Sequence, residues 1–284
     1  MTPQPSPERP ELREAYFFHQ TGRLSEAEAL YRSIIEHDPS NPGAVHGLGV
    51  ILAEHGHKNL ALQYFEEAIS LNPKESVFYR SYARLLDESG DTARALSALQ
   101  TSLYIRPLDT ETLTLLADLC RKIDDRYAAM GVYRQILVLN PANGSIHAAL
   151  AECLFSGGLL DDALPHYAAA VRLLPFNAAL KIAYVDALLA ARQPREASEV
   201  LTSGEMLFAA TAGVHQRRGR VALALDDVET GVAALERAYC LAPEDISILR
   251  DYAGALHEAG DYLSETKALQ RLYTLDSRLN KAKK

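Results

Sequence analysis

Prolines recur along the chain at a constant step, and this spacing constrains the fold more than any other feature. Each is separated from the last by 34 residues or by twice 34, and they are Pro39, Pro73, Pro107, Pro141, Pro175 and Pro243. A fixed period of this length indicates an array of similar structural units. The chain is therefore predicted to be a repeat protein, in which each unit packs on its neighbours rather than around one shared core.

The stretch from Pro42 to Pro73 shows what one unit contains. Two apolar-periodic segments of helical length flank a break around Gly56, which predicts a helix, a turn and a second helix. Small and apolar residues occupy fixed offsets that recur in later units, here Val45, Leu48, Gly49, Leu52, Ala61, Phe65 and Ala68. Because neither helix can bury its apolar stripe alone, each pair is expected to stack on pairs like itself.

Eight repeats in one phase are predicted, with no second domain. Their expected ranges are 8–41, 42–75, 76–109, 110–143, 144–177, 178–211, 212–245 and 246–279, flanked by a disordered leader at 1–7 and a basic tail at 280–284. The sixth repeat is degenerate, because Ala209 replaces its closing proline and Gly204 interrupts its second helix. That helix is expected to be short or distorted.

Small residues are predicted at the contact between the two helices of a pair. On the first helices they are Gly49, Ala83, Ala117 and Ala151, and on the second helices Ala61, Ala95, Ala129 and Ala163. Larger residues such as Phe65, Tyr133 and Tyr167 are expected to fill the space between pairs.

The spacing that runs from Val45 to Pro73 resembles the tetratricopeptide repeat of long bacterial arrays, and it recurs over nearly the whole chain. The resemblance implies an all-α fold, a right-handed α-solenoid superhelix of about eight 34-residue helix-turn-helix repeats. It also implies a concave groove, lined by the first helix of each repeat, that receives an extended or helical segment of a partner protein.

One peptide-binding version of this family holds a C-terminal carboxylate with Lys and Asn at set positions of the first helices. The corresponding pair in the third repeat is Arg80 and Arg84, and Leu115 stands where the next repeat would carry Asn. This departure argues against a carboxylate clamp of the chaperone-adaptor type.

If the first helices line the groove, the ninth position of repeats three to seven projects into it. These residues are Arg84, Asp118, Glu152, Asp186 and Arg220, and apolar Phe155, Ile182, Leu189 and Leu223 lie nearby; Arg80 and Arg121 are counted with this surface. The pattern predicts a groove in repeats four to seven for a segment with basic and apolar residues. The alternative is that Arg84–Asp118 and Asp186–Arg220 are surface ion pairs, worth at most about 1 kcal/mol each.

A second basic group lies in repeats seven and eight, where Arg217, Arg220 and Arg250 accompany Gln216. Such a group can bind a carboxylate or a phosphate. The alternative is a solvated charged surface without a ligand.

The sequence predicts neither a metal site nor catalysis. His46, His55 and His57 lack the further ligands that zinc needs. No nucleophile motif or glycine-rich phosphate loop is present, so no cofactor is expected. The three cysteines, Cys120, Cys153 and Cys240, form no CxxC and are predicted to be small buried hydrophobes in a reducing compartment.

Composition excludes other classes of function. A formal charge of −8 argues against general nucleic-acid binding, which needs an excess of Lys and Arg. No apolar stretch approaches the roughly 18 residues of a membrane span, and the first residues do not resemble a signal peptide. The expected location is cytoplasmic.

The leading hypothesis is a non-catalytic protein–protein interaction scaffold whose groove holds a partner segment. Self-association or docking at the last repeat is also expected, since its second helix carries Leu269, Leu272, Tyr273 and Leu275 with no capping helix beyond it. One rival is an accessory or substrate-recognition module of a glycosyltransferase- or sulfotransferase-type enzyme, because such arrays resemble the N-terminal halves of O-GlcNAc-transferase-like enzymes. A third hypothesis is a secretion or pilus-assembly component.

Overall fold

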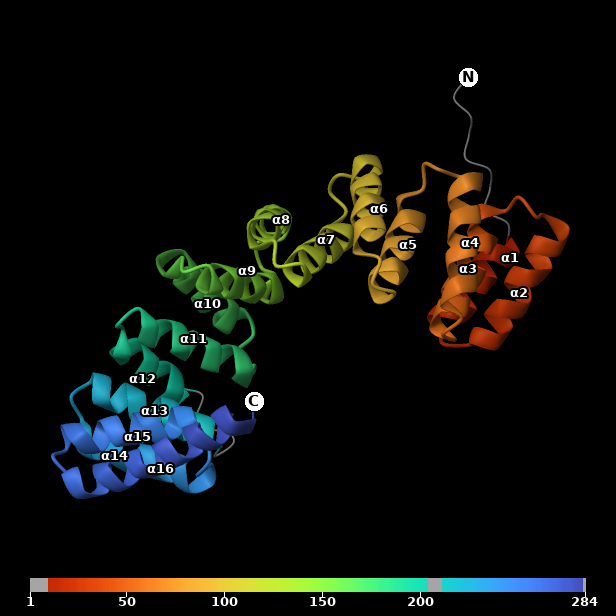
Figure 1. The fold of residues 1–284 in the computed structure, drawn as a ribbon. Coiled ribbons are helices and arrows are strands. Elements are labelled where there is room, and N and C mark those ends of the chain that lie inside the picture. Colours follow the sequence, from red (N-terminus) through yellow and green to blue (C-terminus); the bar gives the residue numbers. More distant parts are fainter. Residues whose placement is uncertain (1–9, 204–210, 283–284) are drawn as a thin grey trace. The chain divides into compact units, whose positions relative to one another are not determined.

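The computed structural model describes residues 10–203 and 211–282, with side chains through Ser277. Within these residues it contains 16 helices and no strand. The chain divides into two compact units, Met1–Leu139 and Asn140–Lys284, and each is described by itself (Figure 1). Among the described helices, none combines the length and the hydrophobicity that a bilayer-spanning segment needs.

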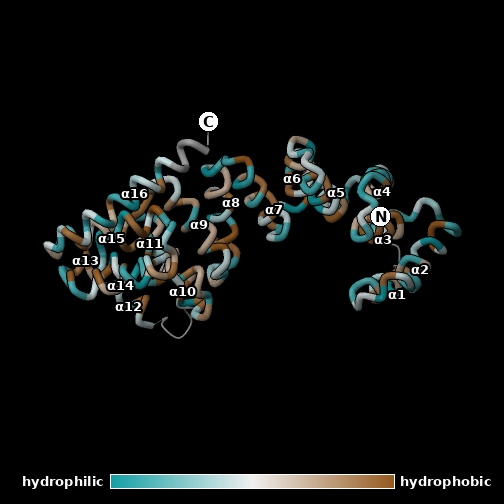
Figure 2. The backbone as a smooth tube through the Cα atoms, turned by 60° about the horizontal axis from the view of Figure 1, so that its bottom comes forward, coloured by the Kyte–Doolittle hydropathy of each residue, from teal (hydrophilic) through white to brown (hydrophobic). Residues whose placement is uncertain are grey.

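The N-terminal unit consists of four helix pairs. They are α1 (Pro10–Gln20) with α2 (Leu24–His37), α3 (Pro42–Glu54) with α4 (Lys58–Leu71), α5 (Ser76–Glu88) with α6 (Thr92–Ile105), and α7 (Thr110–Lys122) with α8 (Arg126–Leu139). Each odd-numbered helix packs on the even-numbered helix that follows, and α2, α4 and α6 each pack on the first helix of the next pair. Hydrophobic and hydrophilic residues are interleaved along the helices, as amphipathic elements require (Figure 2).

The C-terminal unit repeats the same arrangement. Its pairs are α9 (Gly144–Ser156) with α10 (Leu160–Leu173), α11 (Ala178–Ala190) with α12 (Pro194–Ser203), α13 (Ala212–Ala224) with α14 (Val228–Leu241), and α15 (Ile246–Glu258) with α16 (Tyr262–Ala282). The predicted all-α solenoid of about eight helix-turn-helix repeats is confirmed.

Some predictions about the ends of elements fall outside what the structure describes. The described part of α12 ends at Ser203, so Gly204 and Ala209 lie beyond the described residues. The predicted leader at 1–7 lies outside them too. The predicted tail at 280–284 begins as helix instead, since α16 continues to Ala282, and residues 283–284 are not described.

The turn inside each pair has the same backbone conformation throughout. One residue per turn has a positive φ, between 57° and 85°, at a constant 34-residue interval: Gly22, Gly56, Gly90, Asp124, Gly158, Arg192, Asp226 and Gly260. A Cβ on Gly56 would meet nothing within 4 Å, so the backbone conformation rather than crowding favours glycine there. At Asp124, Arg192 and Asp226 the fold holds a side-chain-bearing residue in a conformation that disfavours one.

Asparagine caps explain where several first helices begin. The side chains of Asn41, Asn143 and Asn177 accept hydrogen bonds from the backbone N–H groups three residues later, over 3.0, 3.2 and 3.0 Å. Each cap satisfies a backbone donor that the helix leaves without a partner, which stabilises the start by about 1 kcal/mol.

The small residues predicted between the two helices of a pair are buried, but the neighbour of Gly49 is Phe65 rather than Ala61. A Cβ on Gly49 would lie 2.9 Å from a ring carbon of Phe65, and a Cβ on Gly219 would lie 3.1 Å from the carbonyl oxygen of Gly231. The alanines predicted for this contact are buried, and so are the larger Phe65, Tyr133 and Tyr167. These slots therefore set how closely the two helices approach.

The prediction for the cysteines is correct for two of three. Cys120 and Cys153 are buried, whereas Cys240 is exposed. Cys240 lies in the last turn of α14, at the slot that holds the exposed Tyr104 in α6 and Val138 in α8. This slot faces away from the neighbouring helices, so apolar character at Cys240 does not imply burial.

Candidate functional site

A hollow of about 310 Å³ lies beside the first helices of the N-terminal unit. Its lining comes from α3, α4 and α5 and consists of Val50, Ala53, Glu54, Phe65, Ser81, Arg84, Leu85 and Glu88. Four of these residues are apolar, three are charged and one is a serine. Arg84, a predicted groove residue, is exposed here and has no ion-pair partner among the described residues.

The two carboxylates at the edge of this hollow have partners. His19 Nε2 lies 3.3 Å from Glu54 Oε1, and Lys58 Nζ lies 3.8 Å from Glu88 Oε2. Glu54 and Glu88 remain about half exposed, so water screens both pairs. Their carboxylates therefore stay accessible to a cationic side chain.

The buried wall behind the hollow contains His46 of α3. Its ring stacks on Phe78 with centroids 4.7 Å apart, and its Nε2 lies 2.9 Å from Ser81 Oγ. Burial, together with the positive charge of Arg80, lowers the pKa of His46 to about 4. His46 is therefore a neutral packing residue at pH 7.

The described residues hold no group of three or more His, Cys, Asp or Glu side chains placed to bind a metal ion. His55 and His57 lie exposed in the turn between α3 and α4, whereas His46 is buried.

Arg80 is engaged within the fold. Its Nη1 lies 2.7 Å from Asp109 Oδ2 and its Nη2 lies 2.8 Å from Glu111 Oε2, which links α5 to the start of α7. Burial would raise the pKa of Asp109, but hydrogen bonds from Thr112 and Arg80 lower it. The guanidinium of Arg80 is thus directed at carboxylates of its own chain.

The fourth pair places its predicted residues on one helix face. Asp118 is exposed, accepts a hydrogen bond of 3.1 Å from Tyr133 Oη, and lies 3.8 Å from Arg121 Nη2 one turn later. The ion pair Arg84–Asp118, offered as an alternative, is not formed among the described residues. Leu115 is partly buried and packs against the core.

In the C-terminal unit, Asp186 of α11 is held by Arg217 of α13. The guanidinium donates two hydrogen bonds to the carboxylate, from Nε over 2.8 Å and from Nη2 over 2.6 Å. Both side chains are only about a quarter exposed, at 29% and 25%. A bidentate pair of this kind neutralises the carboxylate, so Asp186 offers little charge to a ligand.

The next bridge on this face joins α13 to α15 through Asp251. Gln216 Nε2 donates to Asp251 Oδ2 over 2.7 Å, and Arg220 Nε lies 3.9 Å from the same oxygen. The predicted pair Asp186–Arg220 is therefore wrong, because Asp186 pairs with Arg217 and Arg220 faces Asp251. Arg250 of the predicted basic group is exposed on α15.

The remaining predicted groove residues of this unit differ in exposure. Glu152 is exposed, whereas Phe155, Ile182, Leu189 and Leu223 are partly buried. Phe155 packs edge-on against Tyr167 with ring centroids 6.4 Å apart, and Leu189 packs against a buried cluster. These apolar side chains serve the core on one side and present the other to water. The groove predicted through repeats four to seven includes residues of both units and stays a prediction.

The hollow contains residues that the sequence argument missed, and one of them carried a signal. Val50 occupies the ninth position of the second repeat, the slot that holds Arg84 one repeat later. Applying the ninth-position rule one repeat earlier finds it. Ser81, Leu85 and Glu88 follow from the packing of α5 on α3 and carry no comparable signal.

Comparison with known families identifies repeats in two segments of the chain. A family model described as tetratricopeptide repeat matches residues 46–110 and 114–178. Among curated relatives, Cellulose synthase 1 operon protein C of Komagataeibacter xylinus is 25% identical over 254 residues, 88% of this chain and 17% of the relative. Cellulose synthase operon protein C of Escherichia coli (strain K12) is 26% identical over 151 residues, 49% of this chain and 12% of the relative. The chain thus spans less than a fifth of the length of these relatives.

Solved structures show the same fold. A tetratricopeptide repeat protein from Parabacteroides merdae is 20% identical with a TM-score of 0.56, covering 87% of this chain and 97% of its own. The C-terminal part of a repeat-containing protein from Cytophaga hutchinsonii is 14% identical with a TM-score of 0.67, covering 84% and 98%. YrrB, described as a TPR protein with an unusual peptide-binding site, is 18% identical with a TM-score of 0.61, covering 66% and 96%.

Proposed function

Since the chain is a tetratricopeptide-repeat protein, we propose that it is a non-catalytic scaffold that binds a protein or peptide segment on the surface of its first helices. The observation that carries the proposal is the hollow beside α3 and α5. Val50, Ala53 and Leu85 give it apolar lining, while Arg84 stands exposed at its edge. A recess that combines apolar side chains with a few charged groups is the usual composition of a binding site.

The charges around the hollow favour a segment with both basic and apolar residues. Glu54 and Glu88 supply two half-exposed carboxylates against the single positive charge of Arg84. An apolar side chain of the segment would enter the hollow, and a neighbouring Lys or Arg would meet a carboxylate. The chain's net charge of −8 adds long-range attraction for such a segment.

The test uses peptides selected from a random library on the full chain, followed by fluorescence anisotropy with an enriched peptide. We expect enrichment of Lys or Arg next to apolar residues, and about tenfold weaker binding after Glu88→Lys, since a carboxylate–cation contact becomes a repulsion. Arg84→Glu should strengthen binding. Arg134→Glu, an exposed position on the second helix α8, is the matched control and should change nothing. Equal effects of Glu88→Lys and Arg134→Glu would contradict the proposal.

A second candidate function is an accessory or substrate-recognition module of a glycosyltransferase. The observation that favours it is the naming of the curated relatives after cellulose synthase operons. The test is turnover by a cellulose-synthase-type enzyme from the same genome, with and without the purified chain. Stimulation of turnover supports this candidate. Turnover by the isolated chain alone would contradict both functions.

The proposal includes self-association through the last helix pair. On α16, Leu269 and Tyr273 follow Tyr262 by seven and eleven residues, so the three side chains share one helix face. Tyr262 is 64% exposed, Leu269 45% and Tyr273 78%. Light scattering at high concentration should show dimers that Tyr273→Lys disperses, and a strict monomer would count against this part. A cytoplasmic location also belongs to the proposal, since Cys120, Cys153 and Cys240 form no disulfide with one another.

A further inference from the structure

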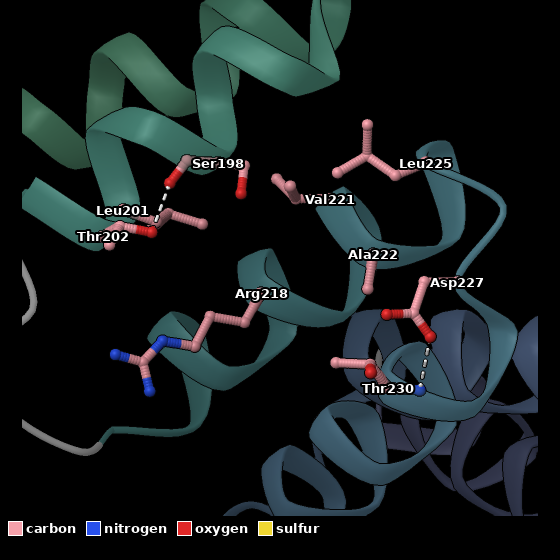
Figure 3. A pocket seen from close by; sticks show the side chains of 9 residues that line it. All are labelled: Ser198, Leu201, Thr202, Arg218, Val221, Ala222, Leu225, Asp227 and Thr230. Atoms are coloured by element: carbon pink, nitrogen blue, oxygen red, sulfur yellow. Dashed lines mark hydrogen bonds between the residues drawn. The ribbon is translucent and has the colours of Figure 1, made fainter.

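Comparing the helix pairs of the C-terminal unit slot by slot finds two places where the packing between pairs changes. The first is the junction of α12, α13 and α14, which borders a cavity of about 260 Å³ (Figure 3). Its lining includes Ser198, Arg218 and Ala222, in the slots that hold an apolar cluster one repeat earlier, made by Leu164, Tyr184 and Leu188. This junction is open because its side chains are smaller or charged, while the neighbouring helices are present.

The second place is the last helix, α16, where the apolar side chains are kept but the described residues include no pair that covers them. One slot of the second helix is at most 5% exposed in each of the first seven pairs, where it holds Tyr31, Phe65, Leu99, Tyr133, Tyr167, Leu201 and Leu235. In α16 this slot holds Leu269, which is 45% exposed. The difference follows from the packing, since α14 packs on both α13 and α15, whereas α16 packs on α15.

The residues around Leu269 form a stripe of the kind that packs on a helix. Tyr262, Thr266, Leu269 and Tyr273 are spaced by four, three and four residues, so they share one helix face, and all four are exposed. In α14 the slot of Tyr273 holds Tyr239, whose ring stacks on that of Tyr252 in α15 with centroids 5.6 Å apart. The stripe on α16 thus has the composition of a helix-packing surface without the neighbouring helix.

We propose that a second copy of the chain covers this stripe with its own α16, packed antiparallel about a two-fold axis near Leu269. The inference rests on the self-association in the proposed function and adds which helix meets which. In this arrangement Tyr273 of each copy lies opposite Thr266 of the other, since the two residues lie four positions after and three before Leu269. A large ring facing a small side chain lets two helices approach closely, as Phe65 does against Gly49 within a pair.

The first helix of the chain is unsuited to cover α16. In α15, Leu249 and Tyr252 belong to the apolar cluster that includes Tyr239 of α14. The same two slots of α1 hold Glu11 and Glu14, and both are exposed. Packing α1 of a second copy on α16 would bury these carboxylates against apolar side chains, which is unfavourable. A contact between two last helices closes at two copies, whereas a first-to-last contact would continue into a filament.

The first measurement is sedimentation equilibrium of the full chain over a concentration series. We expect a monomer–dimer equilibrium that stops at two copies. Growth beyond two copies would overturn the proposal and leave self-association standing, because it indicates a head-to-tail contact. A strict monomer at the highest concentration would overturn both the proposal and the self-association. Neither result bears on peptide binding at the hollow beside α3 and α5, which is measured separately by anisotropy.

A size exchange tests which residues meet across the axis. Thr266→Tyr and Tyr273→Thr should each weaken dimerisation about tenfold, the first by a clash with the opposite ring and the second by loss of contact. The double variant places a ring opposite a small side chain again, so its dissociation constant should return to within about threefold of the parent's. A double variant that dimerises no better than the single variants would overturn the proposal.

Thr274→Tyr is the matched control for the clash. Thr266 and Thr274 are both exposed, and each hydroxyl donates to the backbone carbonyl four residues earlier, over 2.7 and 2.8 Å. Thr274 lies off the stripe, in the slot that holds the exposed Tyr104 in α6, so a tyrosine is tolerated there. Thr274→Tyr should dimerise as the parent does, and circular dichroism verifies that each variant is folded. An equal loss of dimer in Thr274→Tyr and Thr266→Tyr would also overturn the proposal.

Discussion

Two junctions of the C-terminal unit use the same slots with opposite results. The filled junction, made by Leu164, Tyr184 and Leu188, is an apolar cluster, whereas the open junction, made by Ser198, Arg218 and Ala222, borders a cavity. The helices and turns around them follow one plan. The difference teaches that a repeat is specialised by the side chains at a few slots, while its backbone stays unchanged.

The open junction has a polar contact that offsets part of the missing apolar packing. Replacing large apolar side chains forgoes about 1.5–3 kcal/mol for each one that would have been fully buried. On the face of the first helices, the bidentate pair of Arg217 with Asp186 bridges α13 to α11. The two pairs are thus joined by an ion pair, as α5 and α7 are joined by Arg80 with Asp109.

The largest expected effect breaks the comparison by opening the filled junction. Leu188 is fully buried, so Leu188→Ala leaves a cavity and should lower the free energy of unfolding by about 3 kcal/mol. The matched change at the open junction is Ala222→Leu, which adds volume where space exists and should alter stability by less than about 1.5 kcal/mol. Urea unfolding followed by circular dichroism measures both. Similar losses from the two changes would mean that the junctions do not differ in packing.

A third junction, between α3 and α5, sharpens the comparison because a buried imidazole packs behind its hollow. The pKa of His46 in the folded chain is about 4, below the value of about 6.5 expected when the chain is unfolded. Above pH 6.5 both states are neutral and the stability is complete. As the pH falls from 6.5 to 4 the unfolded chain takes up the proton first, so stability should decrease by about 3 kcal/mol in total.

Urea unfolding at several pH values between 7 and 4 measures this loss. His46→Gln is the control, since its amide cannot titrate and can still bond to Ser81 Oγ. The variant should lose markedly less stability over that pH window than the parent chain does. An unchanged pH profile would mean that other groups cause the acid sensitivity.

The smallest expected effect concerns the ion pairs on the face of the first helices. A double-mutant cycle on Arg217→Ala and Asp186→Ala should give a coupling of about 1 kcal/mol, the upper range for a pair that is about a quarter exposed. The cycle on Arg220→Ala and Asp251→Ala should give a coupling near zero, because those groups are 3.9 Å apart and Arg220 is half exposed. A coupling near zero for both pairs would mean that Arg217 and Asp186 do not stabilise the open junction.

The fold could be predicted from sequence because each repeat restates the same local pattern. The Gly49 and Phe65 slots recur every 34 residues, so an error in one repeat is corrected by its neighbours. Turn glycines such as Gly56 marked the break between helices, and the asparagine caps would have marked several starts. Cys240 shows the limit, since its slot near the end of a second helix faces outward whatever residue it holds.

The site was less predictable, because its contacts depend on how neighbouring helices pack against one another. The ninth-position rule correctly exposes Arg84 and Glu152, because it depends only on the helical period. It cannot tell that Asp186 meets Arg217 rather than Arg220, since that choice depends on how far α13 is rotated against α11. The departures at Ser198, Arg218 and Ala222 are visible in the sequence, but whether neighbours collapse into the space is a property of the packed helices.

The eight turns with positive φ have a consequence for how the length of this chain can change. They recur at one interval with one backbone conformation, from Gly22 to Gly260. Loss or gain of a whole 34-residue segment therefore rejoins matching helix ends, and every remaining turn keeps its register. A deletion of any other size would place a helical residue where the chain must reverse. Growth by duplication and shortening by deletion are thus restricted to whole multiples of one 34-residue repeat.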